Sequence, residues 1–240
     1  MRYYVLVGLL FCSSALYSQD PITELDLSGK VPAAVHAAHA KLFNKDQPIN
    51  SLQWLIAKDS PSNKEISVVV GSGLMFFDPK DPPTPEKRLK RMVCSADNIA
   101  VVLIGESESS FSNQRDWVYT DYLAKVSRVI KQQKPIDTGH IIVIGLAGGE
   151  LELSPEKRLK VDDGPRPEKG KEYLMFLRYV PESGQYINSG ALFRVDGELL
   201  SPLGEHDVFL EGIGNKYSLT GVAEFASDQS CEEHKQRQVQ

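Results

Sequence analysis

The sequence predicts a mainly β (α+β) protein, in which a small antiparallel β-barrel carries a helical N-terminal extension. Short apolar runs rich in branched and aromatic residues follow one another from residue 97 to residue 200. Glycine pairs and prolines separate these runs at short intervals, a spacing typical of antiparallel barrels and sandwiches. No helix of useful length is predicted between them, which argues against a parallel nucleotide-binding sheet.

The N-terminal region, residues 19–92, begins with an alanine-rich segment that predicts a helix. Pro32 can occupy its first turn, and the helix is expected to end near Phe43. Residues 64–77 are rich in valine and phenylalanine and are expected to be β-like. Four prolines between positions 79 and 85 then mark a linker.

A short basic helix is predicted next, from Glu86 to Val93. Thr84 is suited to the N-cap and Pro85 to the first helical position. This helix leads into the expected barrel domain, residues 93–226, which is followed by a polar tail at 227–240.

The strands of the barrel domain are predicted from their apolar runs and the turns between them. They are Ile99–Ile104, Trp117–Ile130, His140–Leu146, Glu150–Leu153, Lys171–Val180, Gln185–Val195 and Glu198–Leu200. Gly148-Gly149 and Asp196-Gly197 are expected to be hairpin turns. Residues 154–170 are polar, and residues 206–225 fit neither pattern clearly.

The first 18 residues have the pattern of a secretory signal. Arg2 precedes an uncharged, mostly apolar run from Tyr3 to Cys12, which is too short to cross a bilayer as a helix. Cleavage is expected after Ser18, with Ala15 as the second choice. The protein is therefore expected to be secreted or periplasmic, with no transmembrane segment after cleavage.

The charge balance argues against a nucleic-acid partner. The chain has 27 basic and 32 acidic residues, a net charge of −5, whereas phosphate-backbone binding requires clustered positive charge. A protein or glycan of the cell envelope is the expected kind of partner. No cofactor is indicated.

The strand region resembles a group of uncharacterised secreted bacterial proteins. The resemblance covers about residues 93–200 and rests on these motifs: Cys94-Ser95-Ala96-Asp97, Tyr119-Thr120-Asp121-Tyr122, Val126-x-x-Val129-x-Lys131, Gly139-x-Ile141-x-Val143 with Gly148-Gly149, and Gly170-x-x-Tyr173-Leu174-x-Phe176-Leu177. The β-region of that group is similar to the five-stranded barrels of the OB and netrin-like type. Netrin-like inhibitors of metalloproteases chelate the metal of their target through an N-terminal cysteine, and neither expected cleavage site creates one. The resemblance therefore implies the barrel alone.

Cys94 and Cys231 are the cysteines that remain after signal cleavage. An oxidising compartment permits a disulfide between them. The alternative is two free thiols, one buried and one in the polar tail.

Asp121 is the most unusual residue of the predicted strands, because aspartate is disfavoured in a strand. It is either a polar contact on a binding face, or a structural residue: a β-bulge position or a carboxylate that accepts backbone or arginine hydrogen bonds inside the barrel. The neighbouring aromatic residues Trp117, Tyr119 and Tyr122 are candidates for the same binding face. Their alternative role is cross-strand packing in the core.

His36 and His39 are three residues apart on the first predicted helix and can face the same way. Two imidazoles at this spacing could hold zinc if a third ligand came from elsewhere in the fold. The alternative is a pair of surface histidines.

These patterns predict a secreted, non-enzymatic protein that acts as a binding or structural module. No catalytic motif supports an enzyme. The alternative is an extracytoplasmic hydrolase assembled from distant parts of the chain, for which His140 or His206 would have to meet a carboxylate and a serine.

Overall fold

A computed structural model describes residues 26–43, 56, 64–69, 84–162, 164–203, 218–228 and 231. The prediction of a mainly β chain is confirmed, since most of the described elements are strands. The expected signal peptide, His206 and most of the proline-rich linker lie outside the described residues. No helix within the described ranges is long and apolar enough to cross a membrane.

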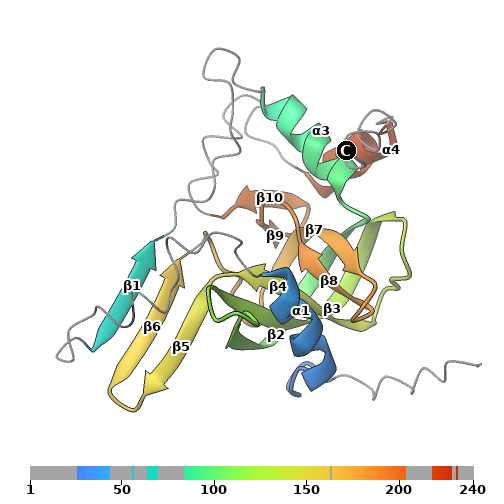
Figure 1. The fold of residues 1–240 in the computed structure, drawn as a ribbon. Helices are drawn as coiled ribbons and strands as arrows, with labels where there is room; N and C mark the ends of the chain where they lie inside the picture. The colour runs from blue at the N-terminus through green and yellow to red at the C-terminus, as the bar shows by residue number, and fades with distance from the viewer. Residues whose placement is uncertain are drawn as a thin grey trace, which may run out of the picture.

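A closed ring of paired strands forms the centre of the fold (Figure 1). Its members, in ring order, are β2 (Asn98–Phe111), β3 (Val118–Gln132), β4 (Ile141–Ala147), β8 (Gln185–Asn188) and β7 (Glu172–Val180), which pairs again with β2. The β4–β8 pairing is parallel, and the other pairings of the ring are antiparallel. The expectation of a wholly antiparallel arrangement is therefore wrong at this one junction, where the chain leaves β4 and returns beside it much later as β8.

The remaining strands extend the ring or form a second sheet. β9 (Phe193–Asp196) pairs with β7, and β10 (Leu199–Pro202) pairs with β9 across the expected turn at Asp196-Gly197. The second sheet has the order β1 (Glu65–Val69), β6 (Lys157–Asp162), β5 (Gly149–Ser154). In Figure 1 this sheet projects from one side of the ring.

The expectation of a hairpin at Gly148-Gly149 is wrong. β4 pairs with β3, whereas β5 pairs with β6, so the chain passes from the ring into the second sheet at this point. Gly148 has a φ of 84°, which a glycine adopts without strain. The strand β6 was not predicted, because only Leu159 and Val161 are apolar in a basic and acidic segment. Both side chains are fully buried, in one apolar cluster with Ile66, Trp117 and Val118.

Alternate residues of the ring strands point into one common core. This inner cluster includes Ala100, Val102 and Ile104 of β2, Tyr122, Ala124 and Val126 of β3, Ile142, Ile144 and Leu146 of β4, Tyr173, Met175 and Leu177 of β7, and Tyr186 of β8. Because side chains alternate along a strand, the intervening residues face outward. Helices cover part of that outer face.

Two helices cover the outer face over β2 and β7. α3 (Pro85–Ser95) begins as predicted, with the Thr84 side chain accepting a hydrogen bond from the backbone N–H of Lys87. α4 (Leu219–Asp228) accounts for the end of the ambiguous C-terminal stretch. Leu89 and Val93 of α3 and Val222 of α4 lie in one apolar cluster with outward residues of β2 and β7.

A third helix, α1 (Ala33–Leu42), covers the outer face over β3 and β4. The helix ends at Leu42 with Phe43 as its C-cap, close to the expected end, and Pro32 is its N-cap, one position before the expected first turn. Val31 and Val35 pack on Leu123 of β3 and Val143 of β4. Figure 1 shows α1 on a different part of the ring from α3 and α4.

Candidate functional site

A carboxylate between two histidines lies where α1 contacts β3. Asp121 is fully buried, and it faces outward with Tyr119 and Leu123, so α1 covers it. His39 Nδ1 lies 2.6 Å from Asp121 Oδ1, and His36 Nδ1 lies 2.7 Å from Asp121 Oδ2. Each carboxylate oxygen therefore has one imidazole from the helix.

His36 also contacts a second carboxylate. Its Nε2 lies 3.2 Å from Glu108 Oε2 on β2, and Glu108 is 53% exposed whereas His36 is 16% exposed. Each ring nitrogen of His36 therefore lies within ion-pair distance of a carboxylate oxygen. A ring nitrogen without a proton would bring its lone pair close to a negatively charged oxygen, which is unfavourable. The geometry therefore fits a doubly protonated, positively charged His36.

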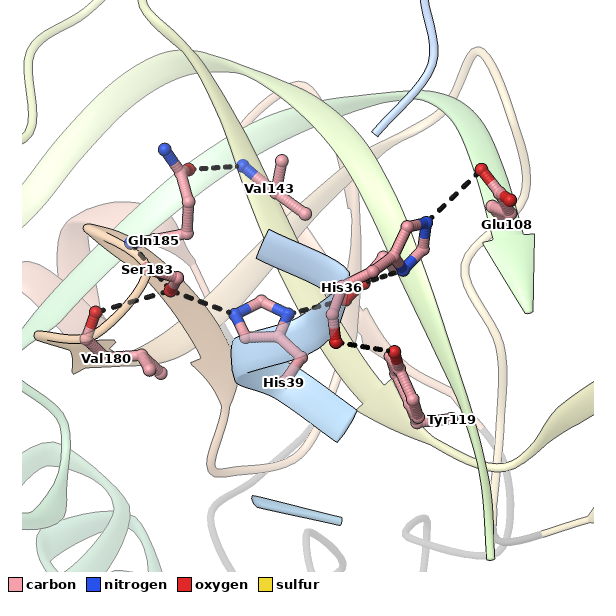
Figure 2. Close-up of polar contacts among 9 residues, drawn as sticks. His36, His39, Glu108, Tyr119, Val143, Val180, Ser183 and Gln185 are labelled. Atoms are coloured by element: carbon pink, nitrogen blue, oxygen red, sulfur yellow. Dashed lines mark hydrogen bonds and ion pairs between the residues drawn. The ribbon is translucent and has the colours of Figure 1, made fainter. Parts of the chain in front are cut away.

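His39 connects Asp121 to a serine in the turn between β7 and β8. His39 is fully buried, and its Nε2 lies 3.4 Å from Ser183 Oγ. Ser183 Oγ also accepts a hydrogen bond from the backbone N–H of Gln185 and donates one to the carbonyl of Val180. Figure 2 shows His39 directed toward Ser183 and His36 directed toward Glu108.

The ionisation of the cluster follows from these contacts. The contact with Asp121 raises the pKa of His36 above its ordinary value of 6.5; burial opposes the rise, and the charges of Asp121 and Glu108 add to it. Burial alone would raise the pKa of Asp121, but the contacts with His36 and His39 outweigh burial and lower it below 3.8. Burial and the Asp121 charge raise the pKa of Tyr119, which keeps its phenol neutral.

A glycine provides the space for the buried pair. Gly145 of β4 is the cross-strand partner of Asp121 in the β3–β4 register. A Cβ atom at position 145 would lie 3.0 Å from His39 Nδ1 and 3.1 Å from both Asp121 Oδ1 and a ring carbon of Phe43. Any other residue would therefore press against the helix.

Further contacts attach α1 and its flanks to the ring. The Tyr119 hydroxyl donates to the carbonyl of His36 at 2.9 Å, and the Phe43 ring stacks on the Tyr119 ring. The backbone N–H of Glu106 donates to the carbonyl of Leu27, and the N–H of Asn113 donates to the carbonyl of Ala40. These two amides report directly on whether the N-terminal segment is docked.

Asp121, Tyr119, Tyr122 and Trp117, the binding-face candidates, are all buried. Tyr122 points into the ring, and Trp117 packs with the second sheet. The alternative interpretation of Asp121 requires a correction. The carboxylate is buried on the outer face of the ring, not inside it, and histidines take the place of the expected backbone or arginine donors.

The structure brings His36 and His39 to one carboxylate. They contact different oxygens of Asp121. No group of three or more histidine, cysteine or acidic side chains in the described part of the chain could hold a metal ion. The three-residue spacing of His36 and His39, which indicated a possible zinc site, instead places both side chains against Asp121.

The structure uses Glu108, Gly145 and Ser183, which sequence reasoning did not identify. Glu108 lies beyond the expected end of its strand at residue 104, because β2 continues to Phe111. Gly145 did carry a signal, since a glycine inside a strand marks a close approach. His140, the histidine considered for catalysis, is 65% exposed and lies 3.7 Å from Asp137.

A disulfide joins Cys94 of α3 to Cys231, with a Cα–Cα distance of 5.3 Å. Of the two alternatives left open by the sequence, the structure has the bridge. It closes a loop with a sequence separation of 137 residues.

No protein-family model matches the chain, and no curated protein matches it. The assignment of function therefore rests on the geometry described above.

Proposed function

We propose that this protein is an exported, non-enzymatic binding or structural module whose partner is a protein or glycan of the cell envelope. The observation that supports the proposal best is the burial of its polar cluster, whose members contact one another. Asp121 and His39 are fully buried, and the contacts of His36, His39 and Asp121 are made with one another and with the ring. Catalytic groups need contact with a substrate, whereas these groups attach a helix to a sheet.

The ring is proposed to be a small barrel of the OB and netrin-like type. Three observations support this interpretation: the ring has five strands, its pairings close through β7 and β2, and alternate residues of its strands share one core. OB barrels are five-stranded, and their outer surfaces and loops carry the ligands. Such a barrel by itself does not identify a ligand.

Export is proposed from residues 1–18, whose pattern is that of a signal peptide. The Cys94–Cys231 disulfide supports this, because disulfides persist in oxidising compartments and are rare in the cytosol. Mass spectrometry of the protein from its native source should find a mature chain that begins near Gln19. A native protein that retains residues 1–18 would contradict export by cleavage.

A hydrolase is the second candidate, because His39 contacts Ser183 with one ring nitrogen and Asp121 with the other. The same chain of contacts joins the nucleophile, the base and the orienting carboxylate of a serine hydrolase. In that reaction, the Ser183 hydroxyl would pass its proton to His39 Nε2 as Oγ bonded to a substrate carbonyl carbon, and the π electrons of the C=O bond would move to the carbonyl oxygen. The contact at 3.4 Å is long for this purpose, and Ser183 Oγ is also used by the turn.

A fluorophosphonate probe separates the two candidates. An activated Ser183 would form an Oγ–P bond and release fluoride, whereas the proposed module should show no labelling that Ser183→Ala abolishes. The same pair of proteins should be compared on ester, peptide and glycoside substrates. Hydrolysis by the wild type that is lost in Ser183→Ala would overturn the non-enzymatic assignment.

A partner can be sought by cross-linking the folded protein to the native envelope fraction. A specific partner should be captured saturably and displaced by excess unlabelled protein. Capture that excess protein does not reduce would count against a binding module.

A further inference from the structure

We propose that α1 is a strap held on the ring by the proton of His36, and that loss of this proton releases the helix while the ring stays folded. The proposal concerns the conformation of the chain and does not depend on the function proposed above. It rests on the groups that surround His36 and on the kind of surface that α1 buries.

The groups that face His36 make its positive charge necessary. Asp121 and Tyr119 face it from β3, Glu108 faces it from β2, and His39 is its neighbour on α1. Asp121 is fully buried and Glu108 is partly exposed, so the buried carboxylate has the greater need of a cation. When His36 loses its proton, two carboxylates lose the charge that lies between them.

The apolar part of the α1 contact is small. The helix sequence is AAVHAAHAKL, in which alanine predominates, and its apolar packing on the ring uses Val35, the preceding Val31 and Leu27, and the Phe43 ring on Tyr119. Alanine offers little apolar surface to bury. The inner cluster of the ring contains no residue of α1, so the ring can keep its core when the helix leaves.

The direction of the pH dependence follows from the two shifted groups. Because docking raises the pKa of His36 above 6.5, its contribution is complete below that value and is lost as the pH rises through the raised pKa. Because docking lowers the pKa of Asp121 below 3.8, its contribution is complete above 3.8 and is lost only in stronger acid. The strap is therefore closed in mildly acidic solution and opens toward alkaline pH.

Amide hydrogen exchange measures this opening in the intact protein. The probes are the N–H of Glu106, bonded to Leu27, and the N–H of Asn113, bonded to Ala40. The control probe is the N–H of Ile104, which is bonded to the carbonyl of Lys171, the residue before β7. After correction for the intrinsic exchange rate, protection at Glu106 and Asn113 should fall between about pH 6 and about pH 9, and protection at Ile104 should not.

The size of the fall is fixed by a second measurement. The fall should approach about tenfold for each unit by which docking raises the His36 pKa, as determined by an NMR titration of its imidazole. Agreement of the two measurements supports the strap. Protection at Glu106 and Asn113 that does not change over this range, or that falls together with protection at Ile104, overturns it.

Two variants and a control locate the effect. His36→Gln should remove the pH dependence of amide protection at Glu106 and Asn113. Glu108→Gln should move the fall in protection to lower pH without a change in the fold, since Glu108 is at the surface. His140→Gln changes an exposed histidine and should leave the fall as in the wild type. If His36→Gln fails to fold, the Glu108→Gln shift still decides, because an unshifted curve there would overturn the proposal.

Discussion

The outer surface of the ring is covered in two different ways. Over β2 and β7, α3 and α4 bury an apolar cluster, and a disulfide ties α3 to Cys231. Over β3 and β4, α1 is rich in alanine and buries a carboxylate between two histidines. One cover is apolar and covalently tied, and the other depends on charge.

The difference teaches how each cover responds to its surroundings. Apolar burial is insensitive to pH, and a disulfide responds only to reductants. A buried carboxylate is destabilised when a partner loses its charge, because an unpaired charge in the interior is strongly unfavourable. We therefore expect α3 and α4 to stay in place under conditions that release α1.

Removal of the disulfide should give the largest effect. A loop that spans 137 residues corresponds to about 5 kcal/mol in the chain-entropy model, an upper figure because strain and residual structure reduce it. Urea unfolding should show this loss in Cys94→Ala/Cys231→Ala and in the reduced wild type alike. A double variant as stable as the oxidised wild type would show that the α3 and α4 cover does not depend on the Cys94–Cys231 disulfide.

Asp121→Asn should have the next largest effect, about 3 kcal/mol, because the amide has no charge for the two histidines. The loss should be confined to the α1 cover, so it is best measured by exchange at the amides of Glu106 and Asn113. Asp137→Asn is the matched control, since Asp137 is 69% exposed. Equal protection in both variants would mean that Asp121 does not hold the helix.

Gly145→Ala tests the space on which the α1 cover depends. The new methyl group would lie 3.0 Å from His39 Nδ1, and overpacking of this kind lowers stability by about 1–3 kcal/mol. Gly221→Ala in α4 is a milder contrast, because alanine favours a helix and the new methyl group would have one close neighbour, Ser218 Oγ at 3.2 Å, which accepts the N–H of residue 221. Gly145→Ala should therefore lower the melting temperature more than Gly221→Ala does, and a stabilised Gly145→Ala would contradict the close approach.

Ser183→Ala should have the smallest effect, about 1 kcal/mol, because the hydrogen bonds of Ser183 Oγ are long: 3.2 Å from the N–H of Gln185, 3.3 Å to the carbonyl of Val180 and 3.4 Å to His39 Nε2. Exchange at the amides of Glu106 and Asn113, measured in this variant and in Asp121→Asn, gives the comparison directly. A loss as large as that of Asp121→Asn would make Ser183 a main support of α1.

The parts of the site that follow local rules could be predicted from the sequence. The alternation of β3 places Tyr119, Asp121 and Leu123 on one face, and the spacing of His36 and His39 places them on one side of a helix. What could not be predicted is that this helix lies on that face. His39 and Asp121 are 82 residues apart, and no local pattern reports a contact at that distance in sequence.

The fold shows the same division. The helices at residues 33–42 and 85–95 were predicted from alanine content, capping and proline position, which are local properties. The parallel β4–β8 pairing and the second sheet depend on which strands meet, a matter of the whole chain. Gly148-Gly149 illustrates the limit: its composition indicates a turn, but the pairing partners of β4 and β5 decide that the turn is no hairpin.

The protonation state of His36 is the most direct test of the account. The nitrogen chemical shifts of its imidazole should show both Nδ1 and Nε2 protonated at about pH 6. This doubly protonated state should persist to a pH above 6.5, the ordinary pKa of histidine. In Asp121→Asn the second proton should be lost at a lower pH than in the wild type. A His36 that carries a single ring proton at about pH 6 in the wild type would contradict the claim that charge holds α1 on the ring.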